Sequence, residues 1–75
     1  MSLRKDLAKE INLLEKEMRE LESKRDRSMA ALVEAVISKR EPEEVEMQYF
    51  RQYTAEIEVK REKLIELTEQ LKTIV

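Results

Sequence analysis

The chain has 75 residues, of which 43% are charged and 4% aromatic, and its formal net charge is −2. Such a chain forms one small domain, expected over residues 1–75, and 41% hydrophobic residues at low net charge disfavour disorder. The lack of Cys and His excludes disulfides and the usual zinc ligand sets, and with no Gly and one Pro a many-stranded fold is hard to build.

The first predicted helix covers residues 3–38. Its apolar residues are separated by alternating steps of four and three, which is a heptad repeat. The seam positions of this repeat are Leu7, Ile11, Leu14, Met18, Leu21, Arg25, Ser28, Leu32 and Ala35. As an alternative, the polar segment 22–28 breaks the helix, and Ser28 caps a separate helix that begins at Met29. The segment contains neither Gly nor Pro and the register runs through it unshifted, so we favour one continuous helix.

The residues around Pro42 predict a turn and the start of a second helix. Proline is tolerated in the first turn of a helix, where its missing N–H has no intrahelical partner. Glu43 and Glu44 place negative charge at the positive end of that helix dipole, and Lys39 and Arg40 lie at the negative end of the first helix. We therefore expect a second helix over residues 42–74, with seam positions Glu46, Phe50, Tyr53, Ile57, Lys60, Leu64, Leu67, Leu71 and Ile74.

The two heptad repeats match each other when the helices are antiparallel. In an antiparallel hairpin the residue numbers of facing pairs have a nearly constant sum. Every layer obeys this rule, from Leu7–Ile74 through Leu21–Lys60 to Ala35–Glu46. The sequence therefore predicts an all-α fold, a two-helix antiparallel coiled-coil hairpin, which can assemble further into a four-helix bundle.

Apolar residues outside the seam predict a partner-binding surface near the turn. They recur at helical spacing on the first helix and lie four apart on the second: Met29, Val33, Val36, Ile37, Val45 and Tyr49. If Met29 and Val36 instead widen the core, Val33 and Ile37 still remain outside it. Clusters of exposed apolar groups usually mark an interface. We expect this end to contact another protein or a copy of itself.

Basic residues form a second, weaker set of candidates. A possible nucleic-acid surface consists of Lys24, Arg25, Arg27, Lys60, Arg61 and Lys63. Acidic residues are interleaved with them, the net charge is negative, and no helix-turn-helix or basic-zipper motif is present. We expect a solvated face of mixed charge, and nucleic acid is not expected as a direct ligand.

No group of residues in the sequence indicates catalysis. The chain lacks a nucleophile paired with a base, a Gly-rich phosphate loop and a set of metal ligands. We therefore expect a protein that is not an enzyme and has no cofactor, metal or small-molecule substrate. No apolar run approaches the ~20 residues of a membrane span, and the first residues lack the apolar core of a signal peptide. We expect a cytoplasmic protein without a membrane partner.

In layout alone, the predicted hairpin resembles the co-chaperones of bacterial type III secretion and the accessory subunits of archaeal replicative DNA polymerases. Either resemblance implies a small accessory subunit of a larger assembly. From the apolar residues outside the seam we expect an adaptor or accessory subunit that docks its helical surface on a larger partner. The alternative is a self-assembling structural dimer in the form of a four-helix bundle.

Overall fold

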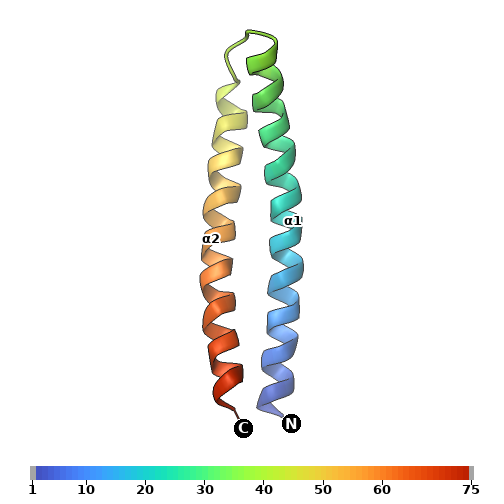
Figure 1. Ribbon diagram of the computed structural model, residues 1–75, viewed down its shortest axis with the longest axis vertical. Helices are drawn as coiled ribbons and strands as arrows, with labels where there is room; N and C mark the ends of the chain where they lie inside the picture. Colours follow the sequence, from blue (N-terminus) through green and yellow to red (C-terminus); the bar gives the residue numbers. More distant parts are fainter. Residues whose placement is uncertain (1, 75) are drawn as a thin grey trace.

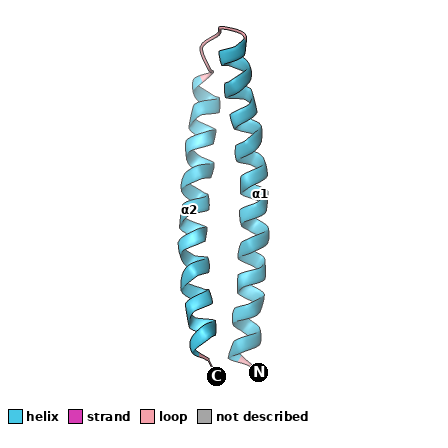
Figure 2. Ribbon diagram, viewed as in Figure 1, coloured by secondary structure: helices cyan, strands magenta, loops and turns pink. Residues whose placement is uncertain are grey.

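The computed structural model describes residues 2–74, which form two antiparallel helices joined by a loop (Figure 1). Helix α1 spans Leu3–Ile37 and helix α2 spans Glu44–Thr73, and the described residues contain no strand (Figure 2). The loop lies at one end of a rod of 57 × 16 × 15 Å and both termini lie at the other. The predicted all-α hairpin is confirmed. Met1 and Val75, the outermost residues of the predicted domain, lie outside the described residues.

Helix α1 runs without interruption through the polar segment 22–28, so the three-helix alternative is wrong. Ser28 is a buried residue in the middle of the helix and not a cap. Nothing in the segment disrupts the i to i−4 hydrogen bonds, because it contains neither Gly nor Pro. The heptad register then places Ser28 at the seam, where it lines the same groove as Tyr53.

The contact between α1 and α2 follows the predicted heptads. Every predicted seam position is at least half-buried, and the side chain of Ile57 is 0% exposed. An ion pair between Lys60 Nζ and Glu17 Oε2, at 2.7 Å, joins the helices about one turn from Leu21. Seam residues such as Leu14 and Leu64 are only half-buried, since two helices cover each other on one side alone.

Helix α1 ends in a Schellman motif. The N–H of Arg40 donates to the carbonyl of Ala35 at 2.8 Å, and the N–H of Lys39 donates to the carbonyl of Val36 at 3.0 Å. Lys39 has a φ of 56°, in the left-handed region that usually falls to Gly. Lys39 and Arg40 therefore lie in the loop, just past the negative end of the helix dipole.

Helix α2 begins after Pro42, whereas the sequence predicts a helix that starts at residue 42. Its first residue is Glu44, and its N-cap is Glu43, which is extended (φ −68°, ψ 137°). Pro42 thus precedes the N-cap, since the chain needs residues 38–43 to reverse direction. Pro42 and Met47 occupy the two positions of a hydrophobic staple, and both line one groove. Glu44 and Glu46 still supply negative charge to the first turn.

Within residues 2–74, neither helix has a stretch long and apolar enough to cross a membrane.

Candidate functional site

Exposed apolar side chains gather at the loop end of the rod. The described part of the chain has ten large apolar side chains that are exposed, and six of them are the predicted partner-binding residues, each at least 44% exposed. The others, among them Leu13, Val59 and Ile65, are scattered along the rod. Val36 and Ile37 are exposed by 68% and 70%, so Val36 does not widen the core.

The structure does not bring the six predicted residues together on one surface. Val33, Val36 and Ile37 line one groove, whereas Tyr49 lines a different groove with Lys24, Arg27 and Ala31. By helical spacing Met29 belongs with the first set, and Val45 belongs with Tyr49.

The physical reason for this division is the antiparallel geometry of the pair. On both helices, the residues that directly follow a seam position lie on one side of the hairpin. The residues that directly precede a seam position lie on the opposite side. Val33 follows Leu32, and Met47 follows Glu46, so these two line the same groove. Tyr49 precedes Phe50 and lies on the opposite side.

The first of these grooves, called the tip groove below, is apolar throughout. It has a volume of about 290 Å³ and is lined by Leu32, Val33, Val36, Ile37, Pro42 and Met47. Leu32, Pro42 and Met47 are half-buried, and the other members are exposed. Leu32, Pro42 and Met47 are not among the predicted partner-binding residues. The staple spacing of Pro42 and Met47 and the position of Met47 directly after the seam are the signals that identify those two residues, and Leu32 is a predicted seam position.

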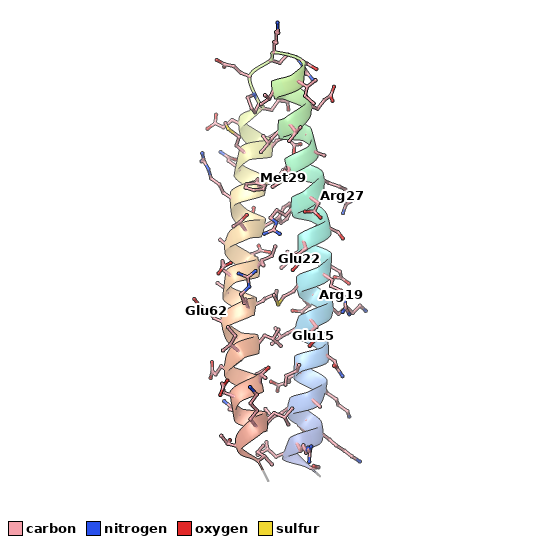
Figure 3. All side chains as sticks on the ribbon, viewed as in Figure 1. Glu15, Arg19, Glu22, Arg27, Met29 and Glu62 are labelled. Carbon is pink, nitrogen blue, oxygen red and sulfur yellow. The ribbon has the colours of Figure 1, made fainter. Side chains whose placement is uncertain are left out.

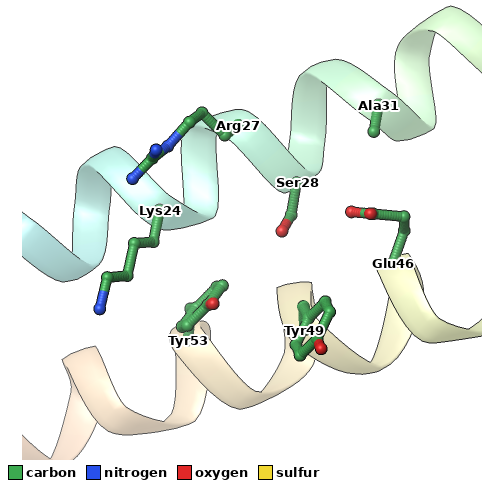
Figure 4. Close-up of a pocket in the computed structure, with 7 residues that line it drawn as sticks. All are labelled: Lys24, Arg27, Ser28, Ala31, Glu46, Tyr49 and Tyr53. Atoms are coloured by element: carbon green, nitrogen blue, oxygen red, sulfur yellow. The ribbon is translucent and has the colours of Figure 1, made fainter.

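The opposite side carries a polar groove of about 340 Å³ (Figure 4). Its lining residues are Lys24, Arg27, Ser28, Ala31, Glu46, Tyr49 and Tyr53. The rings of Tyr49 and Tyr53 are stacked, with centroids 6.1 Å apart and planes at 16°. Because the carboxylate of Glu46 shares this groove with two cations, the groove presents neither a purely positive nor an apolar surface.

The basic residues do not form a continuous unpaired stripe. Lys60 pairs with Glu17, and Arg61 pairs with Glu58 at 2.6 Å. Arg25 is half-buried at the seam, and its Nε is buried without a hydrogen-bond partner among the described residues. Lys24 and Arg27 line the polar groove, and Lys63 is exposed on α2.

Acidic and basic side chains alternate along the outer surface of the rod. Along α1, Glu15, Arg19 and Glu22 follow one another toward Met29 (Figure 3). Interleaving of this kind weakens any attraction to a phosphate backbone. The mixed-charge description from the sequence agrees with this arrangement.

Residues 2–74 contain no group of three or more Asp, Glu, His or Cys side chains that could hold a metal ion. In comparisons with known proteins, no family model, no curated protein and no solved structure matches this chain.

Proposed function

We propose that this chain is a non-enzymatic protein–protein interaction module, a small adaptor or accessory subunit that binds another chain through the tip groove. The observation that carries the proposal is the apolar wall of Val33, Val36 and Ile37, which stand 50%, 68% and 70% exposed beside a groove without polar lining residues. Exposed apolar clusters of this kind on a small protein usually mark an interface.

The strength of such an interface can be bounded. Full burial of a Val or Ile side chain contributes ~1.5–3 kcal/mol. Since these three side chains are already partly buried, covering them contributes roughly 3–5 kcal/mol in total. Association itself costs an estimated 4–15 kcal/mol. The tip groove is therefore an anchor, and a stable complex needs further contacts along the rod.

The shape of the groove favours a helical occupant. A shallow apolar groove between two helices accepts the apolar ridge of a third helix, whose anchors recur every three or four residues. Met47 can adjust to different ridges, because its unbranched side chain is flexible and polarisable.

The double substitution Val33→Glu with Ile37→Glu tests the proposal. Two carboxylates in an apolar interface lose their hydration without gaining partners. We therefore expect that the variant no longer captures the binding partner from extracts of the cells that naturally produce this protein. Helix content should persist, because both side chains are exposed and Glu is a good helix former. The matched control is Val59→Glu with Ile65→Glu, which makes the same change at exposed positions away from the groove. Equal capture by the two variants would contradict the proposal.

A self-assembled four-helix bundle is the second candidate. The half-buried seam residues, such as Leu14 and Leu64, favour it, because a second hairpin lying alongside would cover them. A side-by-side bundle of two hairpins would be a dimer with a length close to the 57 Å of one hairpin. Light scattering combined with small-angle X-ray scattering on the purified chain tests for that mass and that length.

A further inference from the structure

The apolar residues of α1 beside the tip groove form a pattern that is symmetric about Val33. Met29 and Ala30 precede Val33 by four and three residues, and Val36 and Ile37 follow it by three and four. All five are exposed. Consider two copies of α1 that are antiparallel and related by a two-fold axis at Val33. A residue that lies a given number of positions before Val33 in one copy is then level with the residue the same number of positions after Val33 in the other copy. Two copies of α1 packed antiparallel about Val33 would therefore oppose apolar residues in every layer.

The charges that flank this apolar pattern are also complementary in the antiparallel arrangement. Asp26 precedes Met29 on the same face of α1, and Lys39 follows Ile37 at the tip. Within residues 2–74 neither takes part in an ion pair. Asp26 lies seven residues before Val33 and Lys39 lies six residues after it, so antiparallel pairing brings Asp26 of each copy within about one residue of the level of Lys39 of the other. Parallel pairing sets Asp26 against Asp26. The acidic loop residues Glu41 and Glu43 line another groove, with Arg40, Ala31 and Glu46.

We propose that a second copy of this chain occupies the tip groove, with the two α1 helices packed antiparallel about Val33. The inference rests on the proposed function, since both use the same groove. In this arrangement Val33 meets its counterpart on the axis, and Met29 of one copy lies level with Ile37 of the other. The flexible Met29 side chain fills the groove beside Pro42. Pairing of this kind also holds two adaptors together. Any other chain that binds the tip groove must then compete with the second copy.

The pairing determines the shape of the dimer. From Val33 to the tip is about 10 Å at a rise of 1.5 Å per residue, so the two rods overlap by only about 20 Å. Each hairpin is 57 Å long, so the dimer extends to about 90–100 Å with its termini at both far ends. A side-by-side four-helix bundle would keep a length close to that of one hairpin.

The experiment uses the full chain in light scattering and small-angle X-ray scattering between about 10 µM and 1 mM, the range suited to a small transient interface. We expect a concentration-dependent dimer with a maximum dimension of about 90–100 Å. Val33→Cys should form a disulfide-linked dimer under mild oxidation, because facing positions on the axis approach disulfide distance. Val59→Cys, at a position 67% exposed on α2, is the control and should crosslink slowly.

A charge exchange tests the flanking pairs. Asp26→Lys and Lys39→Glu should each weaken dimerisation about tenfold, because each changes two symmetric contacts, and the double variant should recover it. If the chain is a monomer at every concentration, the proposed self-pairing is wrong. Loss of partner capture in the variant with Val33→Glu and Ile37→Glu would still support the proposed function in that case. A dimer no longer than one hairpin, or equal crosslinking by Val59→Cys, overturns the antiparallel tip arrangement.

Discussion

Replacement of Ile57 by Ala tests the packing of the hairpin most directly. The Ile57 side chain is 0% exposed and lies at the seam opposite Arg25. The change removes three carbon atoms, which at ~0.8 kcal/mol each amounts to about 2.4 kcal/mol of lost burial. Because neighbours relax only partly into the space left, the total reaches about 3 kcal/mol. A domain of this size has only ~3–5 kcal/mol of stability, so the variant should retain about 0–2 kcal/mol and unfold at a much lower urea concentration.

The assay is urea unfolding followed by far-ultraviolet circular dichroism. Protein concentration must be held constant, since self-association would add to the apparent free energy of unfolding. The control is Val59→Ala, two residues further along α2 at a position 67% exposed. There the lost burial is small and Ala is the better helix former, so the change should stay within about 0.5 kcal/mol.

A specific result would refute the reasoning. If Ile57→Ala lowers the free energy of unfolding by less than about 1 kcal/mol, Ile57 is not enclosed between the helices. The same conclusion follows if the two variants are equally stable. The antiparallel register would then be wrong, because that register places Ile57 in the seam.

Two further substitutions test local features of the hairpin. Lys39→Gly should raise the free energy of unfolding by about 0.5–1 kcal/mol in the same urea assay, because Gly adopts the left-handed conformation without the clash of a Cβ atom. An unchanged or lower free energy of unfolding would show that α1 does not end in this turn. Arg25→Met should stabilise the fold by about 1 kcal/mol, because it keeps an apolar stem and removes a buried Nε that lacks a partner; destabilisation would show that Arg25 makes a favourable polar contact in solution.

The heptad spacing was sufficient to predict the fold. Leu7, Leu21, Ile57 and Leu67 are buried where the repeat places them, and the register accounts for the ion pair between Lys60 and Glu17. Spacing is informative here because a helix has a fixed period, so the sequence alone specifies which residues share a face. The position of Pro42 was less informative, since proline is compatible with the first helical turn and with the residue before the N-cap. Because α1 ends in the Schellman motif at Lys39 and Arg40, Pro42 lies before the N-cap of α2 and not in its first turn.

For the candidate site, the sequence alone determined which apolar residues lie outside the seam, from Met29 on α1 to Tyr49 on α2. Only the tertiary structure decided that Tyr49 and Val33 line different grooves and that Pro42 and Met47 complete the apolar one. It also decided that the Nε of Arg25 is buried without a partner. Helical periodicity describes each helix by itself, whereas the depth of a groove and the solvent access of a side chain depend on how both helices and the loop pack together.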